Sequence, residues 1–232
     1  MEVPLIRLCH RVHCTVVERL NRFTVLVDAG GRRERAYITN TGRLHDHLRR
    51  GAEAYCIPQR PGLRTRLRLI AVSDGGAAAL IDTQLQMKSL EAAWALDALP
   101  WARGCRVAAR NPRLGGSVLD YLLECPGRRL YVEVKSAVLL RGVYAAYPDC
   151  PTLRGRRHVE EIIRNRGRAA LVFVAALPGV EGFTPCREGD PVVAELIRRA
   201  VAAGVEVHAV GMYYDPRGRR VVLYDPDLPV VV

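Results

Sequence analysis

Two residues near the middle of the chain, Glu133 and Lys135, have the types and spacing suited to metal-assisted chemistry on a phosphate. They lie on a strongly strand-like run over residues 132–136, and side chains two apart on a strand project from the same face. A carboxylate is a hard oxygen ligand for a divalent cation, and a neighbouring ammonium can pair with a phosphate or orient a water. Of the 35 basic residues, two are lysines, Lys88 and Lys135, so arginine is the chain's usual solvated cation. An exposed ion pair on a sheet is the alternative interpretation.

A second acid becomes relevant because of the turn that precedes this strand. Pro126-Gly127 separates two apolar runs, which predicts a β-hairpin. A hairpin centred between these residues places Asp120 opposite Glu133, on the face that also carries Lys135, while apolar side chains occupy the other face. Two carboxylates opposed across strands repel each other unless a cation lies between them. We therefore predict a site for Mg²⁺ or Mn²⁺ held by Asp120 and Glu133, with Asp120, Glu133 and Lys135 as the catalytic residues.

The pattern of Asp120 followed by Glu133-x-Lys135 resembles the catalytic core of the PD-(D/E)xK nuclease superfamily. The rest of the chain resembles the sugar fermentation stimulation protein family, SfsA. The matching stretches are Arg22-Phe23, Asn40-Thr41-Gly42, Tyr147-Pro148-Asp149, Thr152, Arg154-Gly155, Arg157-His158, Glu161 and residues 203–206. This resemblance implies an N-terminal OB-like β-barrel followed by a PD-(D/E)xK nuclease-type α/β domain, with DNA binding as the activity.

The resemblance also suggests further candidates for the site. Glu91 lies near the acidic position of the helix before the core, where Met87 stands in place of the family's frequent Asn. Asp149 follows in a loop that the family places near the site, and a turn or helix cap is its alternative role. His158 and Glu161 share one side of a predicted helix. For His158, a structural hydrogen bond and a catalytic role are both open.

Arginines at two places are predicted to bind nucleic acid. In a predicted strand over residues 63–72, Arg64, Arg66 and Arg68 share one face, and such a row of guanidinium groups suits phosphates. A charged strand edge that resists aggregation is the alternative. Arg154 and Arg157, on a helix predicted over residues 154–166, are expected to contact the nucleic-acid backbone.

The remaining pattern divides the chain into two predicted domains. Short strands with turns indicate the OB-like barrel over residues 1–80, and the nuclease-like α/β domain is expected over residues 81–232. In the second domain, helices are expected at residues 82–99, 154–166 and 190–203, and buried strands at 169–174 and 205–211. This order implies an α/β fold, α+β overall, in which helices flank a mixed sheet. The first helix is expected to begin after Asp82 or Thr83.

Composition narrows the partners and the compartment. A formal net charge of +11 and a pI near 9.7 favour a polyanion as the partner. The seven cysteines are scattered without a Cys-x-x-Cys motif and are expected to be mostly reduced. No signal peptide or long apolar span is visible, so we expect a cytoplasmic protein that does not engage membranes.

These observations favour a Mg²⁺- or Mn²⁺-dependent nuclease that hydrolyses phosphodiester bonds in nucleic acid, with DNA as the favoured partner. The alternative is a DNA-binding regulator of sugar-metabolism genes that retains the nuclease scaffold without turnover. A sugar-metabolising enzyme would fit the family name, but the sequence shows no sugar-site signature. A homodimer would suit an enzyme that acts on two strands.

Overall fold

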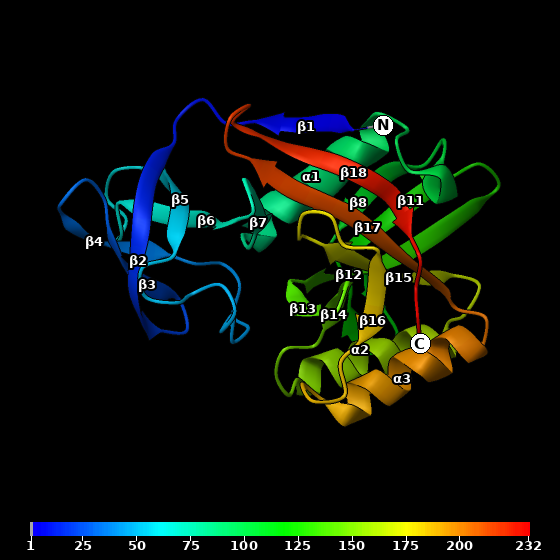
Figure 1. Cartoon of the computed structure of the whole chain (residues 1–232). Coiled ribbons are helices and arrows are strands. Elements are labelled where there is room, and N and C mark those ends of the chain that lie inside the picture. The colour runs from blue at the N-terminus through cyan, green and yellow to red at the C-terminus, as the bar shows by residue number, and fades with distance from the viewer. Residues whose placement is uncertain (1) are drawn as a thin grey trace.

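The structure, a computed structural model that describes residues 2–232, places a β-barrel beside an α/β domain (Figure 1). Five strands close the barrel in the order β4–β3–β2–β5–β6, and β6 pairs back to β4. They are β2 (Val12–Asn21), β3 (Thr24–Asp28), β4 (Arg33–Tyr37), β5 (Glu53–Pro58) and β6 (Leu67–Asp74). Alternate residues, among them Val25 and Val27, are fully buried inside. The predicted small barrel is confirmed.

The sheet continues from the barrel into the α/β domain. Its order there is β7–β17–β15–β12–β11–β8, and β12, β15 and β17 run parallel to one another. The bounds are β7 (Ala77–Leu80), β8 (Arg106–Arg110), β11 (Tyr121–Cys125), β12 (Arg128–Ala137), β15 (Ala169–Ala175) and β17 (Glu206–Asp215). Every residue of β15 is buried, as expected for a parallel strand covered on both faces.

Helices cover the two faces of this sheet. α1 packs on the face that carries Tyr121, whose hydroxyl reaches Glu91 of that helix, whereas α2 and α3 lie side by side on the opposite face (Figure 1). The helices are α1 (Thr83–Ala95), η1 (Pro100–Ala102), α2 (Leu153–Arg164) and α3 (Pro191–Ala202). Within residues 2–232, no helix has the length and apolar character needed to cross a bilayer.

Each α-helix begins at a polar cap, which explains where it starts. The side chain of Asp82 accepts a hydrogen bond from Leu85 N, and Thr152 accepts one from Gly155 N, at 2.7 and 3.0 Å. Asp190 caps α3 in the same way. The three predicted helices are thus present, and the predicted cap Asp82 is the one used.

The first strand lies outside the barrel. β1 (Val3–Arg7) pairs antiparallel with β18 (Arg220–Leu228), which in turn pairs with β17. The sequence predicts that the barrel spans residues 1–80, whereas β1 belongs to the sheet of the second domain. Smaller sheets are formed by β9 (Arg113–Leu114) with β10 (Ser117–Val118), and by β13 (Leu139–Arg141), β14 (Tyr144–Tyr147) and β16 (Gly182–Pro185).

The predicted hairpin is confirmed with its register. β11 pairs antiparallel with β12 so that Cys125 faces Arg128 and Tyr121 faces Val132. Asp120 comes one residue before Tyr121, and its N–H donates to Val132 O at 3.1 Å. Because side chains alternate along a strand, Glu133 lies on the opposite face from buried Val132.

The strand predicted over residues 63–72, which was expected to carry a row of three arginines, begins later than predicted. β6 begins at Leu67, so Arg64 and Arg66 lie in the turn that precedes it. Arg68 is on the strand, but its Nε lies 3.0 Å from Asp82 Oδ2 and its Nη1 donates to Gln84 Oε1 at 2.7 Å. Arg68 is thus engaged at the start of α1, whereas Arg64 and Arg66 are exposed, and their contact with nucleic acid stays a prediction.

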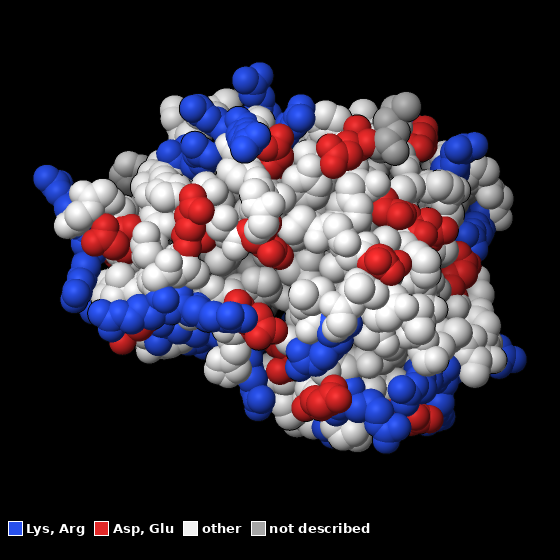
Figure 2. Space-filling model, viewed as in Figure 1, with Lys and Arg blue, Asp and Glu red and all other residues white. Residues whose placement is uncertain are grey.

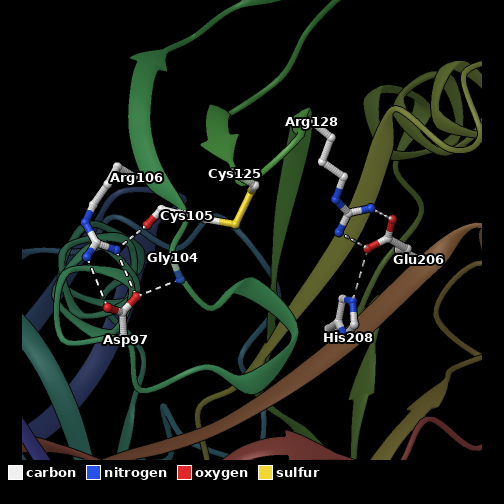
Figure 3. The surroundings of a disulfide bond; sticks show 8 residues. All are labelled: Asp97, Gly104, Cys105, Arg106, Cys125, Arg128, Glu206 and His208. Carbon is white, nitrogen blue, oxygen red and sulfur yellow. Dashed lines mark hydrogen bonds and ion pairs between the residues drawn. A yellow bond between two sulfur atoms is a disulfide. The ribbon is translucent and has the colours of Figure 1, made fainter.

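The expectation of mostly reduced cysteines is also corrected. Disulfides join Cys14 to Cys56 and Cys105 to Cys125. The second one ties the end of β11, at the hairpin turn, to the residue just before β8 (Figure 3). β8 and β11 are antiparallel neighbours, and this pairing brings two cysteines 20 residues apart into contact.

Candidate metal and phosphate site

Glu133 is the centre of a compact polar cluster on β12. It is 2% exposed, and its Oε1 accepts hydrogen bonds from Lys135 Nζ at 2.6 Å and from His158 Nδ1. Its other carboxylate oxygen, Oε2, is buried and has no hydrogen-bond partner among the described residues. A buried carboxylate oxygen without a partner is costly, so this atom marks a position where a ligand would be stabilising.

Asp120 is held at the start of the hairpin beside this cluster. Its Oδ2 accepts a hydrogen bond from Val134 N at 2.8 Å, so the carboxylate lies across the strand that carries Glu133 and Lys135. Burial, followed by the negative charge of Glu133, raises the pKa of Asp120 from 3.8 to about 6. The two acids are therefore close enough to repel each other, as the hairpin register predicts.

The charges in the cluster favour an ionised Glu133 and a protonated Lys135. Burial opposes ionisation of Glu133, but Lys135 and His158 outweigh burial and hold its pKa below the ordinary value. Burial likewise disfavours the Lys135 ammonium, yet Glu133 outweighs it and raises the pKa of Lys135. Among residues 2–232, Glu133 is the one hydrogen-bond partner of the Lys135 ammonium, which has three donors. Lys135 can therefore still donate to an anion.

The donor set fits a hard divalent cation. Asp120 and Glu133 offer oxygen ligands, one of them unpartnered and buried, which is the ligand chemistry of Mg²⁺, Mn²⁺ and Ca²⁺. In residues 2–232 there is no group of three or more His, Cys, Asp or Glu placed to hold a metal. An ion here would complete its coordination with backbone carbonyls, waters or the phosphate oxygens of a substrate.

His158 acts in this structure through Glu133. It is 5% exposed on α2, its Nδ1 contacts Glu133, and its Nε2 lies 3.3 Å from Arg154 Nε, the donor. Of the two roles left open by the sequence, the structure shows the hydrogen bond that orients Glu133. Arg154 and Arg157 are exposed on the same helix, where they can meet a nucleic-acid backbone.

Glu161 holds the turn that leads to Asp120. Its carboxylate accepts from Gly116 N at 3.3 Å and from Asn165 Nδ2 at 2.9 Å. Gly115 has a φ of +54°, and a Cβ there would lie 2.2 Å from Glu161 Oε1. Glycine is therefore favoured at this position, because it adopts the left-handed backbone without strain and leaves the Glu161 carboxylate where it is.

Glu91 is placed away from the Asp120–Glu133 pair. It accepts two hydrogen bonds from Arg110, at 2.6 and 2.8 Å, and one from Tyr121 at 2.8 Å. Tyr121 and Asp120 are consecutive and project to opposite faces of the hairpin, so Glu91 lies on the α1 side of the sheet. Its pKa is lowered chiefly by the hydrogen bonds from Arg110.

Asp149 joins the barrel to the second domain. Its Oδ2 accepts from Leu44 N at 3.2 Å, and Gly42 packs so closely that a Cβ there would lie 2.3 Å from this carboxylate. Next to it, Asn40 Nδ2 donates to Ser136 Oγ at 3.4 Å. The Asn40-Thr41-Gly42 turn of the barrel thus contacts β12 directly after Lys135.

Tyr147 is a site residue that the sequence analysis did not identify as such. Burial raises the pKa of Tyr147, and among neighbouring charges Lys135 and Glu133 act on it most strongly. It also lines a cavity of about 190 Å³ with Asn40, Thr41, Ser136 and Asp149. In the sequence, Tyr147 stands directly before Pro148-Asp149, within a stretch that matches the family. That match did not indicate that Tyr147 lies beside Lys135 and Glu133.

Two family models match the chain. The model described as "Sugar fermentation stimulation protein RE domain" matches residues 84–218, and the one described as "SfsA N-terminal OB domain" matches residues 17–81. Together they cover both structural units.

Individual relatives match over nearly their full lengths. A sugar fermentation stimulation protein homologue of Pyrococcus furiosus is 46% identical over 94% of this chain and 95% of its own. A sugar fermentation stimulation protein homologue of Archaeoglobus fulgidus is 45% identical over 99% of this chain and 100% of its own. A solved structure, described as Pyrococcus furiosus SfsA in complex with Ca²⁺, superposes with a TM-score of 0.94 at 42% identity, covering 99% of this chain and 100% of that one.

Proposed function

This chain belongs to the sugar fermentation stimulation protein family, and from that premise we propose that it is a metal-dependent phosphodiesterase acting on nucleic acid, with DNA as the favoured partner. The observation that carries the proposal is the buried, unpartnered Oε2 of Glu133 beside the carboxylate of Asp120 and the ammonium of Lys135. Supporting evidence comes from the Pyrococcus furiosus relative, which binds Ca²⁺, another oxygen-seeking divalent cation.

Each residue of the cluster has a role in this proposal. Asp120 and Glu133 would hold Mg²⁺ or Mn²⁺, which when bound lowers the pKa of a coordinated water and neutralises charge on phosphate oxygens. Lys135, two of whose ammonium donors have no partner within the described part of the chain, would bind a non-bridging phosphate oxygen or orient the attacking water. His158 fixes the orientation of Glu133, and Arg154 extends the positive surface toward the rest of the nucleic-acid strand.

The electrostatic state of the cluster suits this work. Because Asp120 has a pKa of about 6, it is mostly ionised at neutral pH but at an energetic cost. A bound cation removes that cost, so binding of the ion and ionisation of Asp120 favour each other. Lys135 stays protonated because the negative charge of Glu133 raises its pKa. The same ammonium can also interact with the negative charge of a phosphate.

A second candidate is a nucleic-acid-binding regulator without turnover. The observation that favours it is that the described residues 2–232 supply two carboxylates and no third His, Cys, Asp or Glu to complete a metal group. Such a protein would bind nucleic acid through its positive charge and use a divalent ion for structure alone.

The chain's two lysines provide the test. Purified protein is incubated with labelled single- and double-stranded DNA and RNA, with Mg²⁺, Mn²⁺ or EDTA. We expect metal-dependent cleavage that Lys135→Ala abolishes and that Lys88→Ala, on an exposed position of α1, leaves unchanged. Binding without cleavage under every divalent ion would favour the regulator. Cleavage that survives Lys135→Ala would exclude the proposed site.

A further inference from the structure

One arginine, Arg19, makes several hydrogen bonds that hold together the rim of the barrel facing the site. Arg19 Nη1 donates to Gly42 O and Arg43 O, both at 2.6 Å, and its Nη2 donates to Arg22 O at 3.0 Å. This guanidinium therefore ties the β2–β3 turn to the segment that follows Asn40. Asp149 then fixes the same segment to the second domain through Leu44 N.

This rim presents an arginine and an aromatic ring to solvent. Phe23 is 48% exposed, and the Arg22 guanidinium carbon lies 5.8 Å from the centre of its ring. Arg22 Nη2 also donates to Thr41 Oγ1 at 3.2 Å, and no acid pairs with this guanidinium among the described residues. An exposed ring carrying an unneutralised arginine is suited to a nucleobase and its phosphate.

A surface cavity leads from Arg22 toward β12, the strand that carries Lys135. Arg22, Thr41 and Asn40 line one wall of the 190 Å³ cavity, and Ser136 and Tyr147 line the other. Ser136 follows Lys135 on β12 but projects to the opposite face of the strand. Tyr147, which lines the cavity and whose phenolate would interact with the Lys135 ammonium, therefore links the cavity to the site. The cavity lies below the roughly 300–1,000 Å³ of pockets that enclose a drug-sized ligand, so it suits part of a nucleotide, such as a phosphate with its sugar, and the base remains outside.

The site at the end of this surface is recessed. The side chains of Glu133 and Lys135 are 3% and 12% exposed, and the barrel rim stands beside them. A flexible single strand can bend into such a recess, whereas a base-paired stack would have to open first. Figure 2 shows basic side chains along the lower edge of the barrel, toward α2, which complements a polyanion on this side.

We propose that the groove between the barrel rim and residues 147–152 binds an unpaired nucleic-acid strand, with a base stacked on Phe23 and a phosphate on Arg22. The strand then passes Asn40 and Tyr147 to bring the next phosphate to Lys135. This inference rests on the proposed function and names its substrate as a single-stranded or locally unpaired nucleic acid. The rim residues Arg22 and Phe23 are assigned to substrate selection and not to the chemical step.

Binding is measured by fluorescence anisotropy in Ca²⁺ with a 12-nucleotide single strand and with the same sequence as a duplex. We expect Phe23→Ala to weaken single-strand binding by about 5- to 100-fold, the range of one lost base stack. Phe23→Trp should restore binding and Phe23→Leu should not. Arg22→Gln should reduce the salt slope by about 0.7, one phosphate contact on a single strand. Leu63→Ala, which alters another exposed apolar barrel residue, is the matched control.

The outcomes separate this inference from the proposed chemistry. Wild-type preference for the duplex, or single-strand affinity unchanged in Phe23→Ala, overturns the inference whatever the cleavage assay shows. An affinity loss that Phe23→Leu recovers also overturns it, because bulk and not stacking would then matter. If the single strand is bound through Phe23 and no metal-dependent cleavage occurs, the inference stands and the phosphodiesterase proposal fails.

Discussion

Replacing Asp120 by Asn should make the metal-free protein more stable while removing its affinity for a divalent ion. The carboxylate of Asp120 has its pKa raised from 3.8 to about 6 by burial and by Glu133. Asparagine keeps the shape and can still accept the hydrogen bond from Val134 N. It carries no charge, so the repulsion disappears.

The size of this stability gain, and its dependence on pH, follow from the pKa of Asp120. A rise of about two pH units corresponds to about 3 kcal/mol between the charged and neutral forms, so we expect a gain of about 1–3 kcal/mol after relaxation. Because the folded pKa lies above the unfolded one, the wild type loses stability relative to the variant as pH rises from about 4 to 6. The advantage of Asp120→Asn should therefore be full at pH 7–8 and absent at pH 4.

Thermal unfolding with EDTA or 10 mM Ca²⁺ measures both effects. At pH 7.5 without metal, the melting temperature of Asp120→Asn should rise by about 2–4 °C per kcal/mol gained. Ca²⁺ should stabilise the wild type and leave the variant almost unchanged. Glu124→Gln, an exposed acid on the same hairpin, is the control and should show neither effect. A variant less stable than the wild type at pH 7.5, or equally stabilised by Ca²⁺, would refute the reasoning.

Three further predictions follow from the same structure. Calorimetric Ca²⁺ affinity should fall below about pH 6, by about tenfold per pH unit, because protonated Asp120 cannot act as a ligand; a constant affinity between pH 5 and 7 would contradict this. Gly115→Ala should cost about 1–3 kcal/mol in chemical denaturation, through left-handed strain and displacement of Glu161, and an unchanged midpoint would be inconsistent with it. Loss of the Cys105–Cys125 disulfide, whose ends are 20 residues apart, should cost about 3 kcal/mol, so a Cys105→Ser, Cys125→Ser variant should melt at a lower temperature than the wild type without reductant; equal melting temperatures would contradict this.

The parts of the site that were predictable depend on local rules. Pro126-Gly127 set the turn, and strand alternation then set which side chains share a face, so the relation of Asp120 to Glu133 followed. Helix starts were predictable for a similar reason, because Asp82 and Asp190 are strong caps.

The parts that were missed depend on contacts between distant segments. The hydrogen bonds of Arg19 with the barrel rim, and of His158 with Glu133, form only once separate elements are docked. The alternation of arginine with leucine and threonine predicted a strand from residue 63, but β6 begins only at Leu67, after the loop that joins it to β5. The Cys105–Cys125 pairing likewise arises from the β8–β11 ladder, which no local pattern revealed.

The central claim is that Asp120 and Glu133 together hold a divalent ion beside Lys135. Anomalous diffraction from a crystal soaked in Mn²⁺ tests it most directly. We predict a peak within about 2.0–2.6 Å of a carboxylate oxygen from each acid, with Glu133 Oε2 as one of them, and no such peak in Asp120→Asn. A map with Mn²⁺ bound elsewhere and none between these two carboxylates would contradict the account.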